Sequence, residues 1–444
     1  MAKRLFFVMI CLCSALESKA LATNVKEAVK SALLTNPTIS ADEAEVRASQ
    51  WEVDSARAGY FPSVGISGGV GGYENIRFRE KNSSVSGPLS TTVTRFVTTP
   101  SVTVTQTIFD GLATPYAVEY AHKVVQGAQS VLGQTSEQIA LDAITAYANL
   151  RAQERLLNLA DYNIQKHTNL LEKVKKRVQG GISTIADVYQ VESRLKDAIV
   201  IKDRFEGQRE EALASFIDVV GFRPEALEHP HIPEDLLSTN VEKILTTVSQ
   251  ANPGILLANA RLEIQKAAFD QTLPPFLPTL RVEAGTNGPN LNPFGTRGKV
   301  TTHRAQLVLD YNLYSGGKNT AQRNAARERV VEAKKRLDVA RRNAAKQARS
   351  AWGTFISAHK QTKDAKKAVE VDEKLEHAYL LQFELVALPL LNLVDAYVSY
   401  FRAKADQINA EAEEDIRHAT LLALMGMLKS TFLSDNECCE DKIE

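Results

Sequence analysis

Histidine and cysteine, the residue types that most often bind metals or act as nucleophiles, are sparse in this 444-residue chain. The eight histidines are scattered, and the one close pair is His229-Pro230-His231. Two imidazoles this close could bind a metal, but a proline-rich connector is more typical of a solvated turn. The pattern therefore predicts no metal site.

Phosphate binding and nucleophilic catalysis also lack support. Gly317-Lys318 is followed by Asn319, so the G-x-x-x-x-G-K-[ST] phosphate loop is incomplete. His167 occupies a position in a seven-residue apolar repeat, where a packed or hydrogen-bonded side chain is expected rather than a ligand. No Ser/His/Asp or Cys/His arrangement is present. We predict that the protein is not an enzyme and needs no cofactor.

Residues 1–22 have the pattern of a secretory signal peptide. A positive pair precedes a short apolar core, and Ala20-Leu21-Ala22 is an A-x-A cleavage site. Two of the four cysteines leave with this segment. Cys438 and Cys439 are adjacent in an acidic tail and provide neither metal-ligand spacing nor a disulfide framework. We therefore expect an exported protein without structural disulfides.

Charge and hydropathy exclude two further classes of protein. Lys+Arg and Asp+Glu both number 53, so the net charge is zero. Because nucleic-acid binders usually carry a basic excess, no nucleic-acid partner is predicted. No run of 18 apolar residues follows the N-terminus, which argues against a membrane-spanning helix in the mature chain.

The dominant pattern is a seven-residue apolar repeat between residues 111 and 180. It predicts a helix ~105 Å long that packs along a neighbouring helix, as in a coiled coil. A core of ordinary size cannot cover such a rod, so we expect it to lie alongside other rods. The repeat consists of two rows of residues: Ala143, Leu150, Leu157, Ile164, Leu171 and Val178, and then Ala146, Gln153, Ala160, His167 and Val174.

Alternating apolar and polar residues predict two β-hairpins, at residues 62–110 and 278–314. Residues 72–100 are rich in Ser, Thr and Gly, and they are interpreted as a long loop at the tip of the first hairpin. One apolar and one polar face are what a barrel wall between lipid and water requires. Five aromatic residues lie near the expected strand ends, where interfacial aromatics are placed: Phe61, Phe109, Phe276, Tyr311 and Tyr314.

The chain repeats its own plan, because landmarks of its first half recur in the second half at constant spacing. One common offset relates Asn36-Pro37 to Asn252-Pro253 and Phe61-Pro62 to Leu277-Pro278. A second common offset relates Phe109 to Tyr314, Thr184 to Pro389 and Gly221 to Gly426.

The repeat defines the predicted organisation, which is listed here: signal peptide 1–22; first repeat 23–221, with a helix, the hairpin 62–110, a long helix 111–180 and a helix 184–220; connector 222–240; second repeat 241–428, with a helix, the hairpin 278–314, a long helix 316–386 and a helix 389–426; and a disordered acidic tail 429–444.

Four strands cannot close a membrane barrel, and an open sheet edge cannot lie in lipid because its backbone groups would stay unpaired. The hairpins must therefore pair with those of other copies. Multiples of four strands leave a dimer, a trimer and a tetramer open. The predicted fold class is mostly α-helical with a membrane β-barrel, built from four strands and long coiled-coil helices per protomer.

These landmarks resemble the TolC family of outer-membrane export channels. The resemblance covers Thr23 to about Leu428. The residues that carry it are Asn36-Pro37, Asn252-Pro253, Phe61-Pro62-Ser63 and Leu277-Pro278-Thr279. It also includes the strand-to-helix steps Ile108-Phe109-Asp110-Gly111 and Leu313-Tyr314-Ser315-Gly316-Gly317 and the turns at residues 180–188 and 388–396.

The resemblance implies a homotrimer in the outer membrane, with a 12-strand β-barrel and a 12-helix periplasmic tunnel. It implies two partners, a periplasmic adaptor and an inner-membrane ABC or proton-driven transporter. Residues 178–195 and Gly221-Phe222-Arg223-Pro224 resemble the subgroup that serves type I protein secretion. Drug efflux is the alternative, and a soluble periplasmic coiled-coil adaptor is the alternative of another class.

The family closes its periplasmic end with aspartate rings at the second turn. The matching positions are Asn392 and Asp395, so one carboxylate ring would remain to attract cations. A solvated face residue is the competing interpretation of Asp395. The family's Tyr and Arg lock positions match Phe383 and Leu388, which departs from the pattern. Asp187 of the first turn could anchor a lock, although a helix cap is the favoured role.

Overall fold

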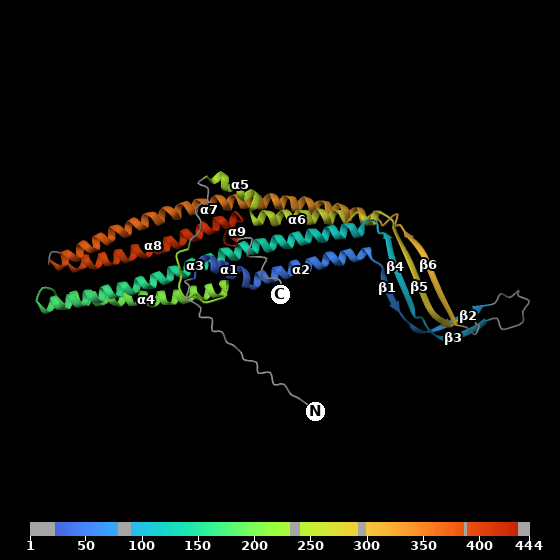
Figure 1. The fold of residues 1–444 in the computed structure, drawn as a ribbon, viewed down its shortest axis with the longest axis horizontal. Coiled ribbons are helices and arrows are strands. Elements are labelled where there is room, and N and C mark those ends of the chain that lie inside the picture. Colours follow the sequence, from blue (N-terminus) through green and yellow to red (C-terminus); the bar gives the residue numbers. More distant parts are fainter. Residues whose placement is uncertain (1–22, 79–89, 231–239, 292–298, 386–388, 434–444) are drawn as a thin grey trace, which may run out of the picture. The chain divides into compact units, whose positions relative to one another are not determined.

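The computed structural model describes residues 23–78, 90–230, 240–291, 299–385 and 389–433. The expected signal peptide, the connector's His231 and both tail cysteines lie outside these ranges. Figure 1 shows the order of the elements. The chain divides into two compact units, which are described separately. Two 67-residue helices, α3 (Ala113–Gln179) and α7 (Lys318–Glu384), each pass from one unit into the other.

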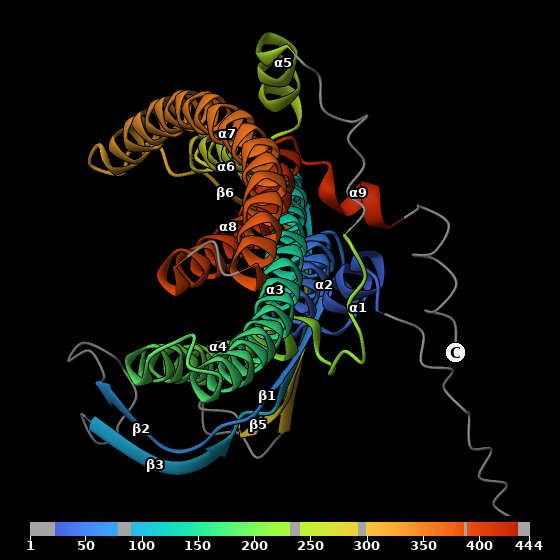
Figure 2. The same ribbon diagram turned by 90° about the vertical axis from the view of Figure 1, so that its left-hand side faces the viewer.

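The first unit contains helical hairpins. The second part of α3 pairs with α4 (Ile185–Val220), and the second part of α7 pairs with α8 (Leu390–Leu424) (Figures 1 and 2). The predicted second heptad row of α3 is mostly buried, including His167 and Val174. In α7 the corresponding row contains small residues, and Leu337, Ala344, Ala351 and Ala358 are buried. Small side chains let neighbouring helices approach closely.

Each half of the first unit joins a short helix to the end of its hairpin in the same way. Helix α1 (Val25–Thr35) ends at Asn36, and α5 (Val241–Ala251) ends at Asn252. The Asn36 amide donates to the Val219 carbonyl at 3.5 Å, and the Asn252 amide donates to the Leu424 carbonyl at 2.8 Å. The repeated Asn-Pro pair therefore ends one helix and ties it to the last turn of another.

The first and last described segments of the chain, and the described part of the connector, are hydrogen-bonded to α3. The Tyr147 hydroxyl lies 2.8 Å from the Thr23 carbonyl oxygen and 2.9 Å from that of Glu228. The buried Glu137 carboxylate accepts hydrogen bonds from the backbone N–H groups of Leu428 and Lys429. These bonds hold the start of helix α9 (Leu428–Phe432).

The prediction of disorder from residue 429 is therefore wrong for residues 429–433, because buried Leu428 and Phe432 anchor a short helix there. Residues 434–444 of the predicted tail lie outside the described ranges.

The second unit contains the strands and the helices that lead into and out of them. Helix α2 (Pro37–Arg57) leads through a short 3-10 turn into β1 (Ser63–Ser67), and α6 (Pro253–Asp270) leads through another into β5 (Thr279–Leu291). Strand β4 (Ser101–Phe109) precedes α3, and β6 (Lys299–Asp310) precedes α7. Each helix thus continues one strand of the sheet.

The four-stranded sheet is antiparallel in the order β1-β4-β5-β6. Val104 pairs with Ala284, and Leu280 pairs with Leu309, so apolar residues share one face. On the opposite face Arg281 forms ion pairs with Glu283 and Asp310. Among the described residues β1 and β6 each have one unpaired edge.

The loop predicted over residues 72–100 contains two strands, which corrects the sequence interpretation. Strand β2 (Val70–Phe78) pairs with β3 (Ser90–Thr98), and Thr99 donates to Gly69 at 2.8 Å to continue the ladder. The Thr-rich composition suggested a loop, but threonine is a strong strand former. The Gly, Pro and Asn content of residues 287–302 likewise predicts a loop in the second hairpin, but residues 287–291 and 299–302 belong to β5 and β6. None of the described helices combines the length and apolar content needed to cross a membrane.

Candidate functional site

The candidate gate residues lie at the two turns of the first unit, between α3 and α4 and between α7 and α8. At the first turn, Asp187 and Thr184 form a capping box. The Asp187 carboxylate accepts from the Thr184 backbone N–H at 2.8 Å, and the Asp187 N–H donates to the Thr184 hydroxyl at 3.4 Å. The favoured role of Asp187 as a helix cap is thus present in the structure.

At the second turn, Asn392 and Asp395 lie in the first turns of α8. Both side chains are exposed, whereas Leu393 and Val394 between them are fully buried. No described residue forms a hydrogen bond or ion pair with the Asp395 carboxylate, whose charge therefore stays available to solvent or ions. Leu388 lies outside the described residues.

Phe383 is buried and is bound by a cation from another helix. The Arg177 guanidinium lies 4.3 Å from the centroid of the Phe383 ring, and its Nη1 donates to the Phe383 carbonyl at 2.6 Å. Arg177 Nε also donates to the Ser183 hydroxyl at 3.3 Å. Arg177 therefore joins the first turn to the last part of α7.

Two lysines of α3 extend this connection along α7. Lys173 pairs with Glu384 at 2.6 Å, and this ion pair lowers the pKa of Glu384. Lys166 pairs with Glu376 and lies close to three tyrosine rings. The ring centroids are 4.6 Å away for Tyr162, 4.7 Å for Tyr400 and 5.3 Å for Tyr397.

An apolar cluster lies beneath these polar contacts. It includes Leu170, Val174, Val191, Leu393 and Tyr397 from three helices. His167 is buried beside it, with its ring 5.8 Å from Tyr397 and edge-on. Burial lowers the pKa of His167, which favours the neutral imidazole. His167 is thus a packed residue of the seam.

Sequence reasoning located the turns but missed Lys166, Lys173 and Arg177, which we name the α3 cation row. Lys166 and Lys173 are one heptad apart beside the predicted seam, and this spacing was the available signal. Their acidic partners lie in the other half of the chain, so the sequence did not indicate which residues they meet.

Among the described residues no group of three His, Cys, Asp or Glu side chains could hold a metal ion. The candidate site consists of two helical turns, an exposed carboxylate and the α3 cation row. Such an arrangement can hold two hairpins together and present negative charge to passing ions.

The sequence profile described as "Outer membrane efflux protein" matches residues 28–221 and 244–427. The chain belongs to this outer membrane efflux protein family. Members of the family are channel proteins of the outer membrane, and this protein is accordingly located there. The two matched ranges coincide with the two halves that share the Asn-Pro ties.

Three relatives illustrate the breadth of the efflux protein family. The chain is 23% identical to outer membrane protein TolC of Escherichia coli over 430 residues, which cover 94% of this chain and 84% of that protein. It is 24% identical to protein CyaE of Bordetella pertussis, over 71% and 65% of the two chains. Fusaric acid resistance protein FusA of Burkholderia cepacia is 22% identical over 49% and 41%.

Solved structures confirm the efflux-protein fold of the protomer. The structure of CusC matches with a TM-score of 0.74 and 14% identity, covering 91% of this chain and 92% of that chain. VceC of Vibrio cholerae matches with a TM-score of 0.71 and 16% identity over 90% and 96%. The predicted combination of long helices and four principal strands is therefore confirmed, with the first two strands each divided into two segments.

Proposed function

We propose that three copies of this chain close a channel that passively conducts exported material across the outer membrane. The observation that carries the proposal is the pair of open edges on β1 and β6. Backbone groups on such edges have no water to bind in the hydrocarbon core and must pair with another copy. Three copies would supply a 12-strand barrel, as the resemblance to TolC implies.

The apolar face of the same sheet favours a channel over a soluble adaptor, because an adaptor has no need of a face that contacts lipid. Val64 and Ile66 on β1 and Leu307 and Leu309 on β6 are exposed in the isolated chain. Lipid contact would cover these side chains. The helices α3 and α7, each ~100 Å long, would form the wall of a periplasmic tunnel.

The protein would act with a periplasmic adaptor and an inner-membrane transporter, which supply the energy. Type I protein secretion is the first candidate process, supported by the resemblance of residues 178–195 and Gly221-Phe222-Arg223-Pro224 to that subgroup. Export of small toxic compounds is the second, and the similarity to a fusaric acid resistance protein favours it.

Asp395 and Asn392 would surround the axis at the closed end of the tunnel, with Asp395 providing three carboxylates in a trimer. The α3 cation row would hold the α7/α8 hairpin against α3 and so keep this end narrow. Opening would require the hairpin to leave Arg177, Lys173 and Lys166. The exposed Lys173–Glu384 ion pair is weak enough to exchange with water. The largely buried Lys166–Glu376 pair and the contacts of Arg177 with the Phe383 ring and carbonyl would oppose opening more strongly.

A deletion strain tests the two candidate processes together. Loss of proteins from the culture medium with unchanged compound sensitivity would support type I secretion. The reverse result would support small-molecule efflux. The channel proposal itself fails if the mature protein is extracted by salt alone as a monomer, or if purified protein in detergent produces no conductance in a planar bilayer.

A further inference from the structure

We infer that the contact between neighbouring copies repeats, residue by residue, the contact between α3 and α6 inside one chain. In the contact between copies, the exposed face of α2 from one copy packs on the groove-lining face of α7 from the next copy. The inference rests on the proposed oligomer and adds the register and the residues that join the copies.

The first step is the equivalence of the elements. The starts of β1 and β5 are separated by the same offset as the starts of α1 and α5. A second, slightly smaller offset relates both ends of α3 to both ends of α7. This second offset also relates the turn glycines Gly221 and Gly426, which both have positive φ. Thus α2 and β1 correspond to α6 and β5, whereas β4 and α3 correspond to β6 and α7.

The second step concerns the strand edges. Inside the chain β4 pairs with β5, and their equivalents are β6 and β1, the two edges without partners among the described strands. Thr105 pairs with Glu283. The offset between α3 and α7 relates Thr105 to Asp310, and the offset between β1 and β5 relates Glu283 to Ser67. Asp310 of one copy is therefore expected opposite Ser67 of a second copy. Leu313 and Tyr314, which follow β6, are both 82% exposed, whereas their counterparts Ile108 and Phe109 are 60% and 38% exposed. A second copy would therefore cover part of their surface.

The third step concerns the helices that continue these strands. Inside the chain, Gly127 of α3 faces Ile264 of α6 so closely that a Cβ on Gly127 would lie 2.8 Å from Ile264 Cδ1. The offsets convert this pair into Glu332 of α7 and Ala48 of α2. Because the two helices of the internal contact are antiparallel, the same order is expected between copies.

The exposure of α2 supports this assignment. Trp51 is 73% exposed, whereas its counterpart in α6, Ala267, is 3% exposed. Ala41 and Ala44 are also exposed, although their counterparts Leu257 and Ala260 are buried. The α6 positions are buried in a chain that already contains α3 and α7. Helix α2 has no such packing on one face until a second copy supplies its α7.

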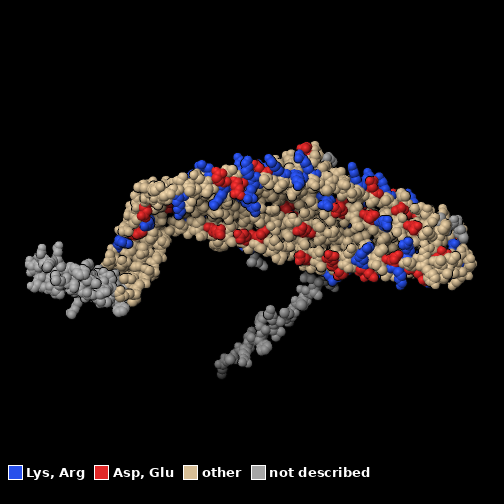
Figure 3. Space-filling model, turned by 180° about the vertical axis from the view of Figure 1, so that it is seen from behind, with Lys and Arg blue, Asp and Glu red and all other residues tan. Residues whose placement is uncertain are grey.

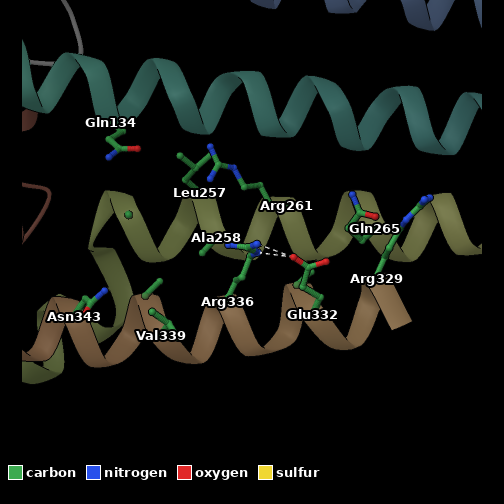
Figure 4. Close-up of a pocket in the computed structure, with 13 residues that line it drawn as sticks. Gln134, Leu257, Ala258, Arg261, Gln265, Arg329, Glu332, Arg336, Val339 and Asn343 are labelled. Carbon is green, nitrogen blue, oxygen red and sulfur yellow. Dashed lines mark hydrogen bonds and ion pairs between the residues drawn. The ribbon is translucent and has the colours of Figure 1, made fainter. Parts of the chain in front are cut away.

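The receiving surface is a groove of about 740 Å³ beside α7, entirely within the second unit. Figure 4 shows Arg329, Glu332 and Arg336 along α7, and Arg261 on α6, extending toward α3. Glu332 pairs with Arg336 at 2.7 Å. No ion pair involves Arg261 or Arg329 within the described part of the chain. The groove therefore carries an excess of positive charge over an apolar base that includes Leu257 and Ala333.

Charge complementarity identifies the occupant as α2. Residues 318–349 contain eleven Lys and Arg against three Asp and Glu, and basic side chains gather along the upper edge of the face in Figure 3. Residues 37–57 contain five acidic and two basic residues. In the inferred register Trp51 is level with Arg329, Glu52 lies beside it, and Glu45 is within one residue of Arg336. A guanidinium on an indole face adds a cation–π contact.

Disulfide trapping tests the register. In a chain with Cys438→Ser and Cys439→Ser, we expect Ala48→Cys with Glu332→Cys to form covalent dimers and trimers on oxidation. The control, Ala48→Cys with Val339→Cys, moves one thiol ~10 Å along α7, beyond the reach of a disulfide. Equal cross-linking of both pairs, or of neither, would overturn the inference.

A charge exchange provides the second measurement. Arg329→Glu should weaken the oligomer in detergent, as measured by light scattering, and adding Glu52→Arg should restore it. Failure of the double variant to recover any oligomer would count against the pairing. Light scattering of the unsubstituted protein in detergent separates the two proposals, because a trimer with negative trapping refutes only the register, and a monomer refutes both.

Discussion

The guanidinium of Arg177 covers the ring of Phe383 at 4.3 Å and donates to the carbonyl of the same residue at 2.6 Å. One side chain thus binds both the ring and the backbone of the residue where α7 nears its turn. Because Arg177 also reaches Ser183, the two turns of the first unit share a single cation.

Arg177→Ala should loosen the α7/α8 hairpin and raise the conductance of the channel. The lost cation–π contact and charged hydrogen bonds together predict a stability loss of ~2 kcal/mol. Conductance in planar bilayers and thermal unfolding in detergent measure the two effects. Lys176→Ala, at an exposed neighbouring position, serves as the control. Parent-like currents in Arg177→Ala would show that Arg177 does not keep the closed end of the channel narrow.

Asp395→Ala should raise conductance or weaken cation selectivity, because it removes the exposed carboxylate at the start of α8. Asp395→Glu retains the charge and should retain selectivity. Reversal potentials across a salt gradient give the measurement. Identical selectivity in the parent and Asp395→Ala would remove Asp395 from the gate.

Because of Asp415, we expect the folded protein to be more stable in mild acid than at neutral pH. Burial raises the pKa of its carboxyl to about 7, with Glu414 and Glu411 adding to the effect and Arg151 opposing it. Since the folded pKa exceeds the unfolded value of 3.8, this contribution is complete below about pH 4 and is lost as pH rises through about 7. At ~1.4 kcal/mol per pKa unit, the loss is at most ~4 kcal/mol.

Asp415→Asn should flatten the stability profile between these pH values, as measured by denaturant unfolding at several pH values. Asp406→Asn, at an exposed position on the same helix, should leave the slope intact. An unchanged slope in Asp415→Asn would assign the pH dependence to other groups.

The two Asn-Pro ties provide a matched comparison within one chain. Asn252→Ala should destabilise the protein by ~1–3 kcal/mol because the Leu424 carbonyl loses a 2.8 Å hydrogen bond near buried residues. Asn36→Ala should cost less, since its bond to Val219 is 3.5 Å long. Unfolding free energies of the two variants give the test, and a larger loss for Asn36→Ala would contradict the geometric argument.

Sequence periodicity located most of the fold because the helices and strands are long and regular. The heptad row through His167 and the offset pairs such as Asn36 and Asn252 depend on local spacing, which the sequence displays directly. Strands β2 and β3 were missed because their Ser, Thr and Gly content resembles a loop, and pairing between them decided the outcome.

Long-range pairing limited the prediction of the candidate site. Arg177 and Phe383 lie in different halves of the chain, and Lys166 meets three tyrosines from two helices. Heptad spacing indicates that such residues lie beside a seam, but not which helix lies across it. Asp187 was placed correctly as a cap because its partner, Thr184, is close in the sequence.

The duplicated plan has a consequence for how the assembly can change over time. In the proposed assembly the seams between repeats alternate: one lies within a polypeptide, and the next lies between two polypeptides. In the inferred register, Gly127 and Ile264 could change together without affecting recognition between chains, whereas Trp51 and Arg329 would decide which chains accept each other. Two related channels in one cell could therefore avoid mixed assemblies by diverging at the second kind of seam alone.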